Sequence, residues 1–254
     1  MLSFNSLLSL STYFLHRLAN NVDTSSVPFY NPSLEGGSML ENAGDSLGEP
    51  LNVIISGLST PAVLTNDGII NYARAIGFSE ECFNIHLGGL MSANLGDGNG
   101  WVNQTYELRQ DYDNAGIGTC LESLVGGNHF RVFRQNGRLA NSGALFLAVS
   151  QEEPATEHHD PVPDGYDVGR WVLPVYHLLV TAIQKVDSSN NLVAAAVGIT
   201  SFNGVTYITT AKNITGLLPP GSEGINHGGQ KFLTCSSFEP KAVQVLRKTG
   251  LPPC

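Results

Sequence analysis

Two neighbouring strand-like segments in the middle of the chain constrain the fold most strongly. Residues 128–135 are rich in aromatic and β-branched side chains and contain neither proline nor glycine. Residues 142–150 follow and are almost entirely apolar, which is typical of a strand buried on both faces. Asn136 and Gly137 between them predict a tight hairpin turn, because both residues tolerate positive φ. The two segments therefore predict a strand pair at the centre of a sheet.

The first of these strands predicts one apolar face and one polar face. Successive side chains on a strand point to opposite faces. Phe130 and Val132 share one face, which we expect to be the core side. His129, Arg131 and Phe133 share the other, so an imidazole and a guanidinium are expected side by side.

A polar segment with three prolines follows the second strand and is typical of a loop. It contains His158, His159 and Asp160. If these three residues are extended, His158 and Asp160 point the same way and His159 points the opposite way.

A helix is predicted after the loop. Asp164 is suited to cap it, with Asp167 in a capping-box-like position three residues later. An apolar stripe at helical spacing extends to Ile183, and Pro174 within it requires a kink or a later helix start. On a straight helix Arg170 lies opposite the stripe, which favours a solvated arginine unless this face meets the preceding loop.

Strand, loop and helix start together predict one polar site. Its candidate members are His129, Arg131, His158, His159, Asp160, Asp167 and Arg170. Of these, we expect His129, Arg131, Asp160 and Arg170 to lie closest together. The alternative is a buried, hydrogen-bonded histidine with surface arginines and an acidic turn, and no site.

The order of these motifs resembles the LssY C-terminal domain family over roughly residues 51–183. The resemblance rests on His129-Phe130-Arg131, the small and apolar second strand, His158-His159-Asp160, and Asp167 with Arg170 at a helix start. The chain departs from the family pattern because His159 and Asp160 are adjacent, and because Gly169 stands where the family has an acid. The chain is also similar to small secreted proteins from mushroom-forming fungi. The resemblance implies the place of a site and no particular activity.

The remaining segments favour an α+β fold. Further elements are predicted at residues 51–57 (strand), 66–75 (helix), 101–111 (strand), 119–125 (helix), 192–210 (hairpin) and 241–248 (helix). Hairpins and long strand–loop–helix spacings favour an antiparallel or mixed sheet with one or two packed helices and long loops. A doubly wound parallel sheet is disfavoured.

The chain is expected to form one large domain preceded by two short segments. Residues 1–22 fit a signal peptide first, an ordinary N-terminal helix second and a membrane anchor third. Residues 23–50 are polar and predict an irregular arm, and residues 51–254 predict the single α+β domain. We therefore expect a secreted protein, with an N-terminal membrane anchor or a cytoplasmic location as alternatives.

Cysteines and sequons agree with export. None of the four cysteines has metal-type spacing, and an even, dispersed set predicts two disulfides. Three pairings are open, and proximity in sequence favours Cys82–Cys120 and Cys235–Cys254 over four unpaired thiols. Two sequons, which predict N-glycosylation, begin at Asn103 and Asn213.

Charge and motifs exclude several functions. The net charge of −9 argues against nucleic-acid binding and against an anionic membrane surface. The glycine-rich residues 88–100 lack the lysine of a phosphate-binding loop. The sequence contains no GxSxG elbow and no HExxH helix.

Three functions remain, and all use the same residues. The first is a secreted or surface domain that binds a small anionic ligand through His129, Arg131, His159, Asp167 and Arg170. The second is a hydrolase whose candidate catalytic groups are His129, Arg131, His158, Asp160 and Arg170. Phosphoesters are the favoured substrates, because LssY-type domains can be joined to membrane phosphatase-like domains. The third is a divalent-metal site formed by His158 and Asp160 with His129. Imidazole and carboxylate ligands suit Zn or Fe, which are the only cofactors that the sequence indicates.

Overall fold

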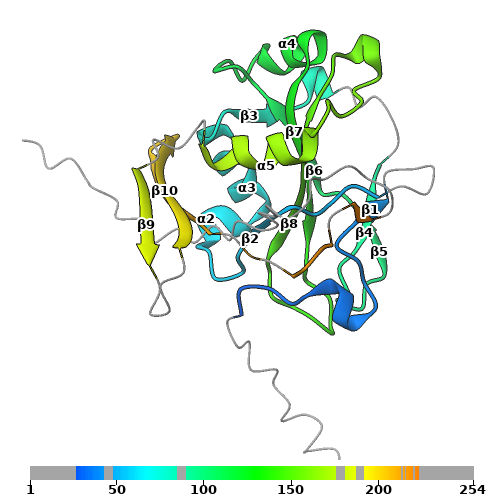
Figure 1. Ribbon diagram of the computed structural model, residues 1–254. Coiled ribbons are helices and arrows are strands. Elements are labelled where there is room, and N and C mark those ends of the chain that lie inside the picture. The colour runs from blue at the N-terminus through cyan, green and yellow to red at the C-terminus, as the bar shows by residue number, and fades with distance from the viewer. Residues whose placement is uncertain are drawn as a thin grey trace, which may run out of the picture.

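The protein has an α+β fold built on three antiparallel sheets, as the sequence predicts (Figure 1). The computed structural model describes residues 27–42, 48–84, 90–175, 181–186, 192–212, 214, 216–219 and 221–222. Its helical segments are η1 (Pro32–Glu35), α2 (Pro61–Leu64), α3 (Asn66–Ala75), η2 (Cys82–Asn84), α4 (Gly118–Val125), η3 (Ala155–Glu157) and α5 (Gly165–Val175). Its strands are β1 (Glu41–Asn42), β2 (Val53–Ile55), β3 (Phe78–Glu80), β4 (Ser92–Asn94), β5 (Trp101–Asn103), β6 (Tyr106–Gln110), β7 (Gly127–Arg134), β8 (Leu145–Glu152), β9 (Thr181–Val186), β10 (Leu192–Phe202) and β11 (Val205–Lys212).

The central sheet has the order β2-β8-β7-β6-β3, with β7 and β8 in its interior. The predicted central strand pair is therefore confirmed. The predicted tight turn at Asn136 and Gly137 is wrong in extent, because the connection between β7 and β8 runs from Gln135 to Ala144. The Asp97 carboxylate holds this loop by accepting from the backbone N–H groups of Asn136 and Gly137, at 3.1 and 2.8 Å.

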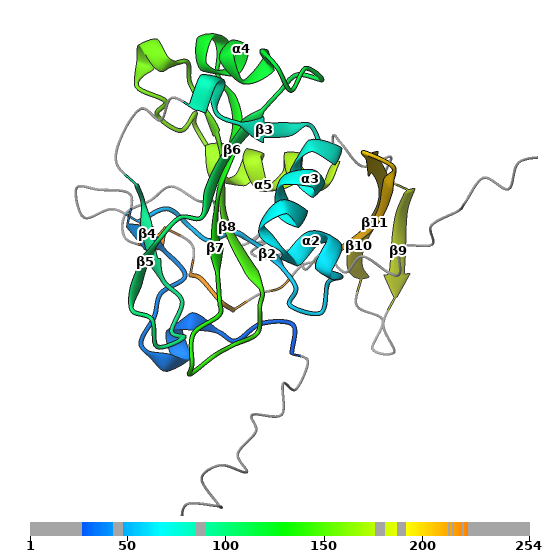
Figure 2. The ribbon, with the colours of Figure 1, turned by 180° about the vertical axis from the view of Figure 1, so that it is seen from behind.

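One face of the central sheet is apolar, as predicted for Phe130 and Val132. These residues pack in one core with α3 and with β11 of the β10–β11 hairpin. The hydroxyl groups of Tyr72 on α3 and Thr209 on β11 form a hydrogen bond of 3.0 Å. Figure 2 shows α2 and α3 between the central sheet and the β10–β11 hairpin.

The opposite face is divided into an apolar half and a charged half. In the apolar half, Phe133 and Phe146 pack with Met39 and Leu40. The segment predicted to be an irregular arm thus contributes buried side chains to the domain. In the charged half, the strands carry the ionisable groups described below.

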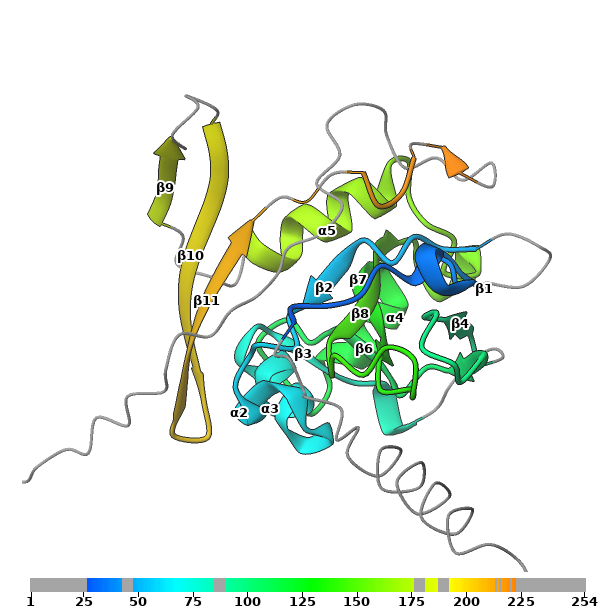
Figure 3. The ribbon, with the colours of Figure 1, turned by 90° about the horizontal axis from the view of Figure 1, so that it is seen from below.

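Helix α5 covers the edge of β8 beyond the short strand β2 (Figure 3). The side-chain amide of Asn52 extends the hydrogen-bonding pattern between β2 and β8 there. Its Nδ2 donates to the Val149 carbonyl at 2.9 Å, and its Oδ1 accepts from the Val149 N–H at 3.0 Å. At Gly169, a Cβ atom would lie 2.6–2.9 Å from the Ser150 backbone. The helix reaches the strand edge this closely because residue 169 has no side chain.

Two expectations about this helix are wrong. Arg170 is buried rather than solvated, and its Nη2 lies 2.6 Å from Asp167 Oδ1. The helix ends at Val175 and does not extend to Ile183, which lies in β9 and pairs with β10. Pro174 is consistent with this end, because proline does not donate to the helical ladder.

The predicted Cys82–Cys120 disulfide is present and joins η2 to α4. The second predicted pair, the sequon at Asn213 and the helix at residues 241–248 lie outside the described residues. Among the described helices, none has the length and hydropathy needed to cross a membrane.

Replacing Gly169 by alanine tests the packing of α5. Alanine improves helix propensity by about 1 kcal/mol, but overpacking against a strand backbone costs about 1–3 kcal/mol or more. We expect a net loss of stability in urea denaturation for Gly169→Ala. Gly116→Ala is the matched control, because its Cβ would meet only Asn114 Oδ1 at 3.4 Å. Equal stability of both variants would contradict the close approach of α5.

Removing the disulfide tests its contribution to stability. It closes a loop with a sequence separation of 38, so its loss increases the conformational entropy of the unfolded chain. We expect the double variant Cys82→Ser, Cys120→Ser to lose about 2–4 kcal/mol in equilibrium unfolding. An unchanged unfolding midpoint would show that α4 is held in place without it.

Candidate functional site

The charged half of the sheet is a buried cluster that strand alternation builds from three neighbouring strands. Cross-strand pairing places Glu107 beside Arg131, Arg109 beside His129, and His129 beside Ser150. All five of these side chains belong to residues that are less than a tenth exposed. Charged groups this deeply buried must be paired or neutralised, because desolvation otherwise costs several kcal/mol per ion.

Arg109 forms ion pairs with four carboxylates of the cluster. Its Nη2 donates to Glu107 at 2.7 Å, and its Nη1 lies 3.1 Å from Glu152 and 3.4 Å from Glu122. Its Nε lies 3.4 Å from Glu81. One guanidinium thus joins carboxylates from β6, β8, α4 and the segment after β3, which fixes how these elements meet.

Arg131 pairs with carboxylates from the N-terminal segment. Its Nη1 donates to Glu49 and lies 3.8 Å from Glu41, and its Nε lies 3.5 Å from Glu107. The Tyr166 hydroxyl of α5 donates to Glu49 at 3.3 Å. Burial alone would lower the pKa of Arg131, but the surrounding carboxylates raise it, so this group stays charged.

Carboxyl groups outnumber guanidinium groups in the described cluster. Two arginines, Arg109 and Arg131, face six glutamates: Glu41, Glu49, Glu81, Glu107, Glu122 and Glu152. If all were ionised, the described carboxylates would exceed the described guanidinium groups by four negative charges. Protons, a bound cation or further basic groups compensate a buried excess of this kind.

The pKa values show where protons collect when no cation is bound. Burial and the neighbouring Glu49 charge together raise the pKa of Glu41 to about 10, against a smaller opposing effect of Arg131. Burial also raises the pKa of Glu122 to about 7 and that of Glu152 to about 8, against the opposing effect of Arg109. These carboxyls hold protons near neutral pH that a cation could replace.

His129 is fully buried and neutral. Burial, followed by the charges of Arg131 and Arg109, lowers its pKa well below the usual value. Its Nδ1 lies 3.1 Å from both Glu152 Oε1 and Ser150 Oγ. Its Nε2 is buried and has no hydrogen-bond partner among the described residues.

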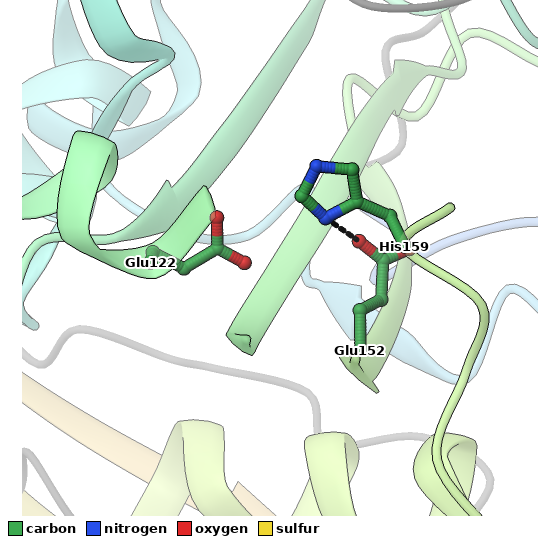
Figure 4. Close-up of side chains that lie close together, drawn as sticks. All are labelled: Glu122, Glu152 and His159. Carbon is green, nitrogen blue, oxygen red and sulfur yellow. Dashed lines mark ion pairs between the residues drawn. The ribbon is translucent and has the colours of Figure 1, made fainter. Parts of the chain in front are cut away.

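Three donor groups converge at the edge of the cluster. Oxygen atoms of Glu122 and Glu152 and a ring nitrogen of His159 all lie within 4.8 Å of one another. Figure 4 shows the Glu122 carboxylate facing the other two groups, with His159 Nδ1 3.9 Å from Glu152 Oε2. Burial and the charge of Arg109 lower the pKa of His159, so its imidazole is held in the neutral form that binds metals.

The candidate residues from the sequence separate into three groups. His129 and Arg131 lie in the cluster, and His159 reaches it from the loop after β8. Asp167 and Arg170 pair with each other on α5. His158 and Asp160 are exposed.

The assumption of an extended segment at residues 158–160 is wrong. His158 and His159 have φ angles of 64° and 58°, in the left-handed region. This tight turn, which follows η3, places His159 toward the cluster and His158 in solvent. The expected proximity of Asp160 and Arg170 to His129 and Arg131 was based on strand alternation and the placement of the loop. In the structure Asp160 is exposed, and Arg170 pairs with Asp167.

Sequence reasoning missed Arg109 and all six glutamates of the cluster. Glu107 and Arg109 have the same alternation as His129 and Arg131, and Glu152 follows Ser150 by two residues. This repeated pattern of ionisable groups on alternate strand positions was the available signal. Glu41, Glu49 and Glu122 carry no such pattern, and their positions depend on the tertiary fold.

Comparisons with protein-family models, with curated protein sequences and with solved structures gave no match to this chain. The function is therefore inferred from the geometry and chemistry of the site.

Replacing Glu41 by glutamine tests whether this buried carboxyl is protonated. Because its pKa is raised on folding, Glu41 favours the folded state most at low pH, and this contribution is lost as pH rises toward 10. We expect Glu41→Gln to match wild type near pH 5 and to exceed it by about 1–3 kcal/mol near pH 8. Urea denaturation at both pH values in the presence of a chelator measures this.

Glu80→Gln is the control for the same experiment. Glu80 is 44% exposed and pairs with Arg74 at 2.7 Å, so its loss is expected to change stability by less than about 1 kcal/mol at either pH. A Glu41→Gln variant destabilised equally at both pH values would instead indicate an ionised Glu41 that pairs with Arg131.

Proposed function

We propose that the protein binds one divalent transition-metal ion through Glu122, Glu152 and His159. The convergence of their donor atoms within 4.8 Å carries the proposal (Figure 4). Ligands of one ion lie about 3–4.3 Å apart, because metal–ligand bonds are about 2.0–2.2 Å long. Side-chain movements of about 1 Å would complete the set. Two carboxylates and an imidazole suit Zn²⁺, Fe²⁺ or Mn²⁺.

The excess of carboxyl groups over guanidinium groups among the described residues supports a cation at this position. Arg109 already bridges Glu122 and Glu152, yet the pKa values of both carboxyls remain raised. A carboxylate oxygen has two lone pairs, so Glu152 Oε2 can accept from Arg109 and also bind an ion. Arg109 would then act as a positioning residue that holds both carboxylates.

Unpartnered imidazole nitrogens give independent support. His159 Nδ1 and His129 Nε2 are buried and have no hydrogen-bond partner among the described residues. Buried polar atoms are normally paired, and unpaired ones often mark a missing ion. His129 Nδ1, which contacts Glu152, would orient that carboxylate as a neighbouring group orients a metal ligand.

The arrangement favours a cation over the small anion considered first. The charged groups around both arginines are glutamates, which occupy the guanidinium donors that an anion would need. The metal-dependent form of the hydrolase alternative remains compatible with this site, because an ion bound there could activate water. His159, with 14% of its side chain exposed, gives the proposed ion a route to solvent.

We also propose that the protein is exported and is related to LssY C-terminal domains. The Cys82–Cys120 disulfide supports export, since disulfides persist mainly in oxidising compartments. The burial of His129 and Arg131 in one cluster supports the relationship, because the same two residues carry the resemblance in sequence.

Metal analysis of neighbouring histidine variants tests the metal site. The full chain, stripped with a chelator, is titrated with Zn²⁺, Fe²⁺ and Mn²⁺ separately and analysed for bound metal after desalting. We expect about one ion per chain in wild type. Loss of one ligand in His159→Ala or Glu122→Gln should weaken affinity at least ~100-fold, since even residues that only orient metal ligands contribute 10–100-fold.

His158→Ala is the matched control, because His158 is adjacent in sequence and exposed. Its metal content should equal that of wild type. Absence of stoichiometric metal in wild type, or equal affinity of His159→Ala, would refute the proposal. Loss of metal in His158→Ala alone would restore the ligand set first expected from the sequence.

A further inference from the structure

Strand β5 lies at the edge of its sheet and exposes two side chains on its outer face. Within the described residues it pairs only with β4, at the end of the sheet β1-β4-β5. Trp101 and Asn103 are exposed, and Val102 between them lies opposite the buried Ala93, on the core side. Alternation therefore places Trp101 and Asn103 beside each other on the outer face, about 6.6 Å apart along the strand.

Trp101 is a large apolar side chain in otherwise small and polar surroundings. The residue is 57% exposed. Its cross-strand partner is Asn94, and the partner of Asn103 is Ser92. An exposed apolar side chain beside an open strand edge favours pairing with other chains, and natural proteins cover or block such edges. This edge of the sheet therefore calls for a cover.

The sequon Asn103-Gln104-Thr105 begins on this strand, and its middle residue anchors it to the domain. Gln104 is buried, its Oε1 accepts from the Met91 N–H at 3.1 Å, and its Nε2 donates to Glu107 at 3.0 Å. Asn103 and Thr105 on either side are exposed. The two side chains that define an N-glycosylation site thus lie in solvent, on a segment that the fold holds in place.

We propose that Asn103 carries an N-linked glycan whose first N-acetylglucosamine ring packs on Trp101. The positively polarised C–H groups of a pyranose ring suit the negative face of an indole. A sugar attached two residues along the same strand face lies within reach of that ring. The glycan thereby covers the exposed tryptophan and hinders the approach of other chains to the edge of β5.

The modification is a group transfer from a lipid diphosphate-linked oligosaccharide, which the secretory pathway supplies. The bond between sugar C1 and the diphosphate oxygen breaks, and the lipid diphosphate leaves with the electron pair. A bond forms between C1 and Asn103 Nδ2, which releases one proton. The inference therefore rests on the proposed export of the protein, and it is independent of the proposed metal ion.

Peptide mapping of the full chain secreted from eukaryotic cells tests the modification. Asn213→Gln is present in every chain, so that one sequon remains. We expect a glycan on Asn103 that is lost in Asn103→Gln and in Thr105→Ala and is kept in Thr105→Ser. Each chain is produced with its own N-terminus and also behind an added secretion leader. Secretion only with the added leader would refute the proposed export, whereas an unmodified Asn103 in a secreted chain would refute the glycan.

Thermal unfolding tests whether the glycan packs on Trp101 or only projects into solvent. We expect Asn103→Gln to lower the unfolding midpoint by about 2–4 °C in the wild-type background and by less than ~1 °C in a Trp101→Ala background. Ile199→Ala is the matched control background, because Ile199 is 58% exposed on strand β10. There the effect of the glycan should equal that in wild type. Equal losses in the wild-type and Trp101→Ala backgrounds would overturn the assignment of Trp101.

Discussion

The pairing of one buried guanidinium with four carboxylates determines how this domain is assembled. Arg109 contacts Glu81, Glu107, Glu122 and Glu152, which come from four different segments. Removing one partner of such a buried network costs about 3–5 kcal/mol, because the charges left behind are unpaired. The network therefore contributes to positioning α4 and the end of β8, together with the Cys82–Cys120 disulfide and the pairing of β8 with β7, whereas apolar contacts position the elements at the other end of the sheet.

Strand alternation gives the two faces of one sheet end different chemistry. On β7, His129 points to the charged cluster, and its neighbour Asn128 lies on the opposite face, where its Nδ2 donates to Gln110 Oε1 at 2.8 Å. Gly127 adjoins both regions, since a Cβ there would lie 2.8 Å from Glu122 Cγ and 3.1 Å from the Tyr112 hydroxyl oxygen.

Local patterns in the sequence predict the local parts of this structure well. The alternation around His129 and Arg131 predicts their shared face, and Thr65, whose hydroxyl accepts from the Gly68 N–H, marks the start of α3. The site as a whole is not predictable in this way. Glu122 joins it through tertiary packing, and His159 joins it through a turn with two consecutive non-glycine residues at positive φ, a rare conformation.

Anomalous X-ray scattering from a crystal of the metal-loaded protein tests the central claim most directly. Data collected on both sides of the absorption edge of the bound metal locate the ion without reference to activity. The account predicts one strong peak about 2.0–2.3 Å from oxygen atoms of Glu122 and Glu152 and from a ring nitrogen of His159. A peak at the exposed His158, or no peak while Arg109 alone bridges the two carboxylates, would contradict it.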